Sequence, residues 1–207
     1  MAENNSGRMR WVPFYRDEGF RRWLWMTSAA FLVLIVGAFV VGLLFPALAE
    51  SMADQFRQLV SDADIVRVDG HISVLGLFRH NVQAMLITIL YGLIPALHLP
   101  VLLLGLNAIL LGALGAYYVN NGISLLVYLA GILPHGIFEI PAIVLALACG
   151  LYLCSYLTGR ILHREDTPQQ PVFMRILRVF VLVITPLLAA AAVLEAYATP
   201  AILNVLR

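Results

Sequence analysis

Long apolar runs recur along this sequence, and they constrain its fold more than any other feature. The first run extends from Leu24 to Phe45 without a charged residue, and about 20 such residues form a helix that crosses the hydrocarbon core of a bilayer. Only 12% of the 207 residues are charged, compared with roughly 25% in soluble domains, and the mean hydropathy is +0.89. The sequence therefore predicts an all-α, polytopic transmembrane helix bundle without a separate soluble domain.

Polar intervals divide the apolar runs into about five spans. Arginines cluster before the first span and around the loop at 159–172, and the positive-inside rule places such clusters in the cytoplasm. We therefore expect a cytoplasmic N-terminal segment (1–23), a first transmembrane helix (24–46), an extracytoplasmic amphipathic loop (47–78) and a transmembrane core (79–207). Membrane lipid surrounds such a chain, and a net charge of +1 gives no reason to expect a nucleic-acid partner.

The interval 47–78 is the longest polar stretch, and it contains more acidic than basic residues. Apolar residues recur in it at helical spacing and predict a short amphipathic helix. They are Leu48, Met52, Phe56 and Leu59. Two interpretations remain open. The helix rests on the membrane or caps the bundle, or it forms a docking surface for an extracytoplasmic partner.

Prolines interrupt the apolar segments and predict helix breaks. They are Pro95, Pro100, Pro134 and Pro141. Pro95 and Pro100 bracket a turn between the second and third spans, and Asn120-Asn121-Gly122 is a further turn signal. The segment 123–133 is too short to span a bilayer, and Pro134 suits the first turn of a helix. We therefore expect a short re-entrant or broken helix, followed by a new helix that begins at Pro134.

His135 and Glu139 are the most costly residues in this region, because hydrocarbon strongly disfavours a carboxylate. Their i, i+4 spacing places both side chains on one helix face. Three roles remain open: a hydrogen bond that locks two helices together, a site for a cation or protons, or an acid–base pair in catalysis. No third metal ligand lies near them in sequence, and no His-Glu-x-x-His motif occurs. We therefore expect no metal, no cofactor and no enzymatic activity.

Four further polar residues are candidates for the same network. Asn107 lies at mid-depth in its span, where it needs a partner across a helix interface. Glu195 either joins the polar pair or has an interfacial role at the end of the last span. Arg79 either anchors the membrane edge or pairs with a buried carboxylate, and Asn81 lies beside it at the start of the second span.

Two stripes of small residues recur at every fourth position. Ala142, Ala146 and Gly150 continue the face of His135 and Glu139, and the other stripe consists of Ala108, Gly112 and Ala116. Small residues at this spacing let another helix approach closely. The polar pair is therefore expected to point into a helix bundle and away from lipid, and the stripes also offer faces for a homo-oligomer.

The sequence around the polar pair resembles the most characteristic run of the stage II sporulation protein M family, a group of multi-span bacterial and archaeal membrane proteins. In this chain the run reads Leu133-Pro134-His135-Gly136-Ile137-Phe138-Glu139-Ile140-Pro141-Ala142. Weaker similarity occurs at Phe78–Val82 and from Leu187 to Pro200. The resemblance covers residues 76–203 and leaves out the N-terminal 23 residues and the loop at 47–75.

The resemblance implies an interaction role in the cytoplasmic membrane of a prokaryote. In spore-forming bacteria the family member works with two cell-wall-degrading partners, the stage II sporulation proteins D and P, and the family brings no catalytic residues to transfer. The expected function is therefore a non-enzymatic membrane scaffold that recruits peptidoglycan hydrolases or other envelope proteins through the loop at 47–78. The alternatives are a small transporter or channel component with a His/Glu site, and an intramembrane enzyme.

Overall fold

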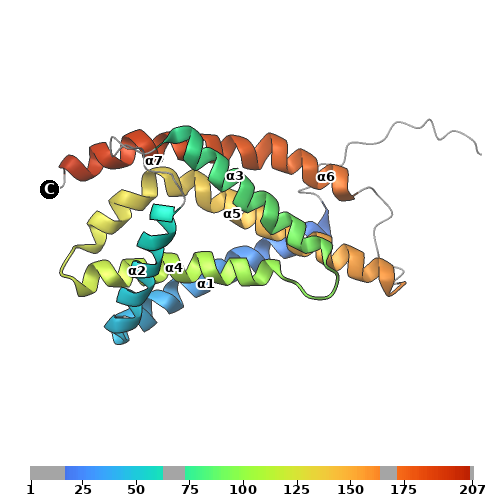
Figure 1. Ribbon diagram of the computed structural model, residues 1–207. Helices are drawn as coiled ribbons and strands as arrows, with labels where there is room; N and C mark the ends of the chain where they lie inside the picture. Colours follow the sequence, from blue (N-terminus) through green and yellow to red (C-terminus); the bar gives the residue numbers. More distant parts are fainter. Residues whose placement is uncertain (1–16, 63–72, 164–171, 206–207) are drawn as a thin grey trace, which may run out of the picture.

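The computed structural model describes residues 17–62, 73–163 and 172–205, and the regular secondary structure of these residues is entirely helical (Figure 1). The elements are α1 (Glu18–Leu44), α2 (Pro46–Asp62), α3 (Val74–Leu90), the 3₁₀ turn η2 (Tyr91–Leu93), α4 (Pro100–Asn120), α5 (Leu125–Ile161), α6 (Val172–Val179), the π-helical turn η3 (Phe180–Ile184) and α7 (Thr185–Val205). Most of the predicted N-terminal segment and part of the loop at 47–78 lie outside the described residues.

Five of the helices are long and apolar enough to cross a membrane, as predicted. They cover Glu18–Leu44, Val74–Leu93, Pro100–Asn120, Leu125–Ile161 and Val172–Ile202. The last of these joins α6, η3 and α7 into one long helical segment. The first helix begins at Glu18, six positions before the expected start, because the side chain of Asp17 caps it by accepting a hydrogen bond from the Phe20 backbone N–H at 3.0 Å. The chain is thus an all-α, multi-pass membrane protein.

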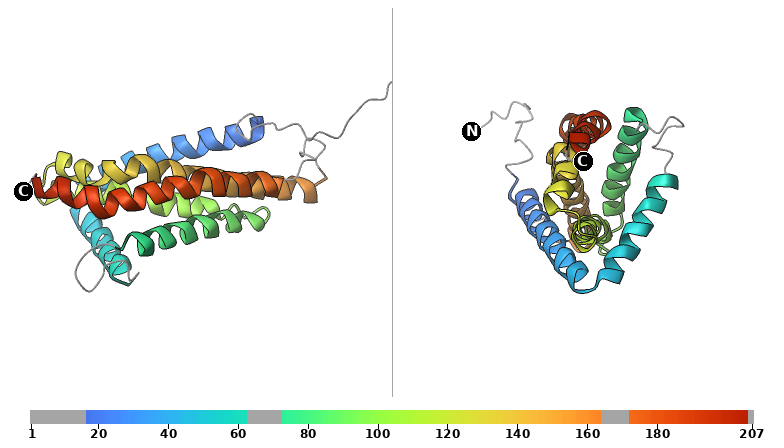
Figure 2. Two further views of the ribbon diagram at one scale, coloured as in Figure 1. Left: turned by 90° about the horizontal axis from the view of Figure 1, so that it is seen from above. Right: turned by 90° about the vertical axis from the view of Figure 1, so that its left-hand side faces the viewer.

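Helix α5 is the centre of the bundle. Two-thirds of its most apolar window is buried within the chain, compared with a third or less for each of the other four long helices. The core around it includes Leu147 and Leu153 of α5, together with Ile184 and Leu188 of the last segment. Figures 1 and 2 show the other long helices arranged around α5. Residues on α5 are therefore the ones best placed to meet several helices at once.

The prediction that Pro134 begins a new helix is wrong. Helix α5 is continuous for 37 residues and contains both Pro134 and Pro141, and it changes direction along its length (Figure 1). Its start is fixed by Ser124, whose hydroxyl accepts from the Leu126 N–H at 3.2 Å. Neighbouring helices and local adjustment make prolines tolerable inside membrane helices, so residues 125–133 form the first turns of a helix that is about 55 Å long.

The turn predicted at Pro95 and Pro100 is confirmed. Pro100 lies in the first turn of α4, and Ala96 and His98 between the two prolines adopt positive φ angles of 65° and 46°. The turn packs against the C-terminal part of α5, where the Thr158 hydroxyl accepts from the Ala96 N–H at 2.8 Å. The chain therefore reverses direction here, and the turn is tied to α5 by this hydrogen bond.

Both predicted stripes of small residues are close helix contacts, but they are contacts within this chain. A methyl group added at Gly112 would lie 2.8 Å from the Cβ of Ala38 and from the backbone nitrogen of Phe39, both in α1. One added at Gly150 would lie 2.8 Å from the backbone oxygen of Thr88 in α3. Ala108, Ala116, Ala142 and Ala146 are all fully buried. These faces are already covered by the chain's own helices, so a homo-oligomer would have to use another surface.

Helix α2 confirms the predicted amphipathic helix in the loop at 47–78. Its inner face consists of the buried Ala49 and Ala53 with the half-buried Met52 and Phe56, whereas Leu48, which was predicted on the same face, is 50% exposed. The right-hand view of Figure 2 shows α1 and α2 diverging like the arms of a V, with α4 seen between them. The Arg57 guanidinium links α2 to α4 by donating to the Tyr117 hydroxyl at 3.1 Å.

A small polar cluster holds together the opposite end of the bundle. Arg175 of α6 forms an ion pair with Asp17 at 3.2 Å, and the Tyr152 hydroxyl of α5 donates to the same carboxylate oxygen at 3.0 Å. The side chains of Arg175 and Asp17 are only 15% and 16% exposed. This cluster places the start of α1, the start of α6 and the C-terminal part of α5 at one end of the molecule.

Candidate functional site

Helix α5 presents His135 and Glu139 on one face, one helical turn apart. Their Nε2 and Oε2 atoms are 4.0 Å apart, and the two side chains are 14% and 25% exposed. His135 lies about 15 Å along the helix from Leu125, well inside the apolar segment. The predicted i, i+4 pair is therefore formed, and it faces the interior of the bundle as expected.

Helix α7 contributes the second part of the site. Glu195 lies in a group with His135 and Glu139 in which one candidate ligand atom from each residue lies within 4.8 Å of the others. One turn further along α7, the Thr199 hydroxyl oxygen is 3.2 Å from Nδ1 of His135. Glu195 and Thr199 thus form an i, i+4 pair of their own, which lies opposite the pair on α5.

Helix α3 contributes the third part. The Asn81 side-chain amide donates to Oε1 of Glu139 at 3.3 Å, and Asn81 is only 9% exposed. A buried amide needs a partner of this kind, because an unsatisfied polar group is costly in an apolar environment. The cluster of Asn81, His135, Glu139, Glu195 and Thr199, called the polar cluster below, therefore links α3, α5 and α7.

Two of the predicted network members lie elsewhere. The Asn107 amide donates to the Leu103 backbone oxygen of its own helix at 2.9 Å, so the expected bond across a helix interface is not formed. Arg79 is exposed, and none of the described residues forms an ion pair with it. Asn107 satisfies its donor locally, and Arg79 forms no ion pair with the carboxylates of His135's neighbours Glu139 and Glu195 in the described part of the chain.

The sequence predicted no metal because only two candidate ligands, His135 and Glu139, are near each other along the chain. In the folded chain a third candidate ligand joins them. Glu195 supplies a third candidate ligand from α7. The π-helical turn at Phe180–Ile184 precedes it, and such a turn inserts one extra residue, which rotates all later residues by about 100° around the helix. The sequence also did not predict the contact between Thr199 and His135. Thr199 was noted only as part of the stretch from Leu187 to Pro200 that resembles the family.

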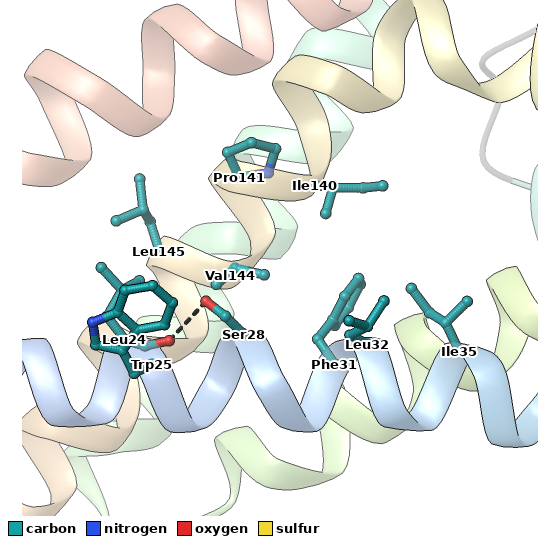
Figure 3. Close-up of a pocket in the computed structure, with 10 residues that line it drawn as sticks. All are labelled: Leu24, Trp25, Ser28, Phe31, Leu32, Ile35, Ile140, Pro141, Val144 and Leu145. Atoms are coloured by element: carbon teal, nitrogen blue, oxygen red, sulfur yellow. Dashed lines mark hydrogen bonds between the residues drawn. The ribbon is translucent and has the colours of Figure 1, made fainter.

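An open pocket of about 540 Å³ lies between α1 and α5 and is separate from the polar cluster (Figure 3). Its walls are residues between Leu24 and Ile35 of α1 and between Ile140 and Leu145 of α5. Ser28 is the polar side chain among them, and its hydroxyl already donates to the Leu24 backbone oxygen at 2.8 Å. The lining of the pocket is therefore mainly apolar.

Comparison with models of known protein families identifies a family for this chain. The family model of stage II sporulation protein M matches residues 26–200, which include nearly all of the described helices. The match begins 50 residues before the region of resemblance seen in the sequence, so most of α1 and all of α2 are part of the family pattern. No curated protein and no solved structure matches the chain significantly. The chain belongs to the stage II sporulation protein M family.

Proposed function

We propose that this protein is a non-enzymatic scaffold of the cytoplasmic membrane that positions envelope proteins, such as peptidoglycan hydrolases, through the exposed face of α2. The observation that carries the proposal is the way α2 is held. It is outside the five long apolar helices, and its buried side is fixed to the bundle while its opposite side stays exposed. A short amphipathic helix held in this way is a suitable docking element for another protein.

The distribution of arginines supports an extracytoplasmic position for α2. Most of the arginines with described positions are at the end of the bundle formed by the starts of α1 and α6 and the last turn of α5. They are Arg21, Arg22, Arg160, Arg175 and Arg178. Only Arg57 and Arg79 of the described arginines lie in α2 and in the first turns of α3. Under the positive-inside rule this distribution favours a cytoplasmic position for the arginine-rich end and an extracytoplasmic position for α2, on the side where peptidoglycan hydrolases act.

The face of α2 that a partner would meet is polar at its centre. Ser51, Asp54 and Gln55 are exposed, and they lie on the opposite side of the helix from the buried Ala49 and Ala53. Asp54 also forms a 2.9 Å ion pair with Arg57. A polar face without a role in packing costs the fold little to change, so substitutions on it separate binding from stability.

The test is copurification of tagged protein from native membranes in mild detergent. The double substitution Ser51→Arg and Gln55→Arg is expected to reduce the recovery of peptidoglycan hydrolases at least tenfold, because two large charged side chains would occupy the docking face. The matched control is Ser51→Ala with Gln55→Ala, which removes side chains without adding bulk or charge. Equal hydrolase recovery with the arginine variant and the wild type would contradict the proposal, provided that both melt at the same temperature.

Transport is the second candidate function, and the polar cluster is the observation that favours it. Ionisable residues inside membrane segments often mark ion or proton pathways. A transporter predicts that Glu139→Gln removes most of the ion flux of protein reconstituted in liposomes, while the thermal stability is largely kept. Flux equal to that of empty liposomes for the wild type would leave the scaffold as the supported function.

A further inference from the structure

We propose that His135, Glu139 and Glu195 bind one divalent transition-metal ion, with Zn²⁺ as the best-matched species, between α5 and α7. This inference does not depend on the scaffold role, because it concerns a site inside the bundle and not the face of α2. It rests on three independent features of the polar cluster: the spacing of the inner atoms, the contacts that orient them, and the balance of charge.

The spacing of the inner atoms is close to that of a metal centre. The three candidate ligand atoms lie within 4.8 Å of one another, and the imidazole Nε2 and the Glu139 Oε2 are 4.0 Å apart. Ligands at about 2.0–2.2 Å from Zn²⁺ in a tetrahedral arrangement are roughly 3.4 Å from each other. The difference is about 1 Å, and the terminal torsions of glutamate side chains are broad, so small torsional changes would close it.

The outer contacts orient the inner atoms toward a common point. The His135 Nδ1 is 3.2 Å from the Thr199 hydroxyl, so this nitrogen can donate its proton there and leave the lone pair of Nε2 toward the carboxylates. Asn81 holds Oε1 of Glu139, which leaves Oε2 toward His135. Histidine ligands of metals commonly donate their other ring N–H to a fixed acceptor, and ligating carboxylates are commonly held by a second hydrogen bond.

The balance of charge calls for a cation. Two carboxylates lie together with one imidazole in an apolar segment, and no arginine among the described residues pairs with either carboxylate. Glu195 accepts no hydrogen bond from the described part of the chain. Like charges at this separation repel strongly where the dielectric constant is low, and a divalent ion would neutralise both.

The chemistry of the ligands selects the class of ion. An imidazole nitrogen with two carboxylates suits Zn²⁺ and similar transition metals, whereas Mg²⁺ and Ca²⁺ prefer sites made only of oxygen ligands. Three protein ligands from two helices, with a third helix holding one of them, would make the ion a crosslink within the bundle. Binding should therefore raise the thermal stability of the folded protein.

The experiment uses the full chain, purified with a tag that contains no histidine, reconstituted in lipid nanodiscs and stripped with a chelator. Zn²⁺ is then titrated in competition with a chromophoric chelator, and the melting temperature is measured with and without Zn²⁺. We expect one Zn²⁺ per chain and a higher melting temperature in its presence. The absence of saturable binding by the wild type would overturn the proposal, whatever the variants show.

The variants locate the site. Glu195→Gln and Glu139→Gln keep the size of the side chains, and each is expected to weaken Zn²⁺ binding at least tenfold, because each removes one of three ligands. Glu50→Gln and His80→Gln are the matched controls, since both residues are exposed, and they should bind Zn²⁺ like the wild type. If shared protons neutralise the carboxylates instead, Zn²⁺ will not bind stoichiometrically. The Glu195→Gln variant will then melt no lower than the wild type in zinc-free buffer, and this result would equally overturn the proposal.

Discussion

Replacing Gly112 with leucine is expected to force α1 away from α4 and to lower the free energy of unfolding by more than about 3 kcal/mol. Even a methyl group at this position would lie 2.8 Å from the Cβ of Ala38 and from the backbone nitrogen of Phe39. The backbone of α1 cannot move aside without separating the helices, because Gly42 of the same helix packs against Ala116 of α4. The yield of monodisperse protein and the melting temperature would measure the effect.

Gly105 provides the control for this substitution. It lies in the same helix, and a methyl group added there would have no atom within 4 Å. Gly105→Leu adds an identical side chain to α4 and is expected to change the free energy of unfolding by less than about 1 kcal/mol. If both leucine variants melted at the wild-type temperature, the close crossing of α1 and α4 would be wrong.

Replacing Asp17 with alanine is expected to cost the second largest amount of stability, about 3 kcal/mol. The substitution removes the N-cap of α1 and leaves Arg175 and the Tyr152 hydroxyl without the carboxylate that both contact. The estimate is below that of a fully buried pair, since Arg175 keeps a side-chain exposure of 15%. Thermal unfolding in nanodiscs at low and high salt would measure the loss.

Two further variants test whether the charge and the capping oxygen of Asp17 each contribute to this stability. Asp17→Asn keeps an oxygen that can cap α1 but removes the charge, so it should lose less stability than Asp17→Ala. Glu18→Ala changes the neighbouring exposed carboxylate and should alter the free energy of unfolding by less than about 0.5 kcal/mol. A stability of Asp17→Ala equal to that of Glu18→Ala would contradict the role of the Asp17 carboxylate in holding Arg175 and Tyr152 at this end of the bundle.

Features that depend on one helix at a time were predictable from the sequence. Apolar runs set the number of spans, because the thickness of a bilayer fixes the length of a helix that crosses it. The i, i+4 spacing of His135 and Glu139 placed them on one face, and the small-residue stripes predicted close crossings such as that at Gly112. The turn at Pro95 and Pro100 followed from the restricted backbone of proline.

Features that depend on how several helices meet were not predictable in the same way. Pro134 was expected to begin a helix, but the packing around α5 tolerates it inside one. Asn107 was expected to bond across an interface, but its own helix offers a carbonyl oxygen at 2.9 Å. Thr199 is 64 positions from His135 in sequence, and the π-helical turn before it changes which residues of α7 face α5.

The buried face of α2 also depends on how several helices meet. Helical periodicity predicted an amphipathic helix from its larger apolar side chains, and two of these, Met52 and Phe56, are half-buried. The most buried residues of the helix are Ala49 and Ala53, whose small side chains the periodicity did not single out. Leu48 is half exposed, beside the polar face that the scaffold proposal assigns to a partner.

The scaffold role is tested most directly by photocrosslinking in living cells from a single position on α2. A photoreactive amino acid in place of Gln55 is expected to form an adduct with a peptidoglycan hydrolase, because Gln55 lies on the exposed face of α2. The same amino acid in place of Leu106, which is 62% exposed on the span α4, should form no such adduct. Equal hydrolase adducts from both positions, or none from position 55, would contradict the proposed function.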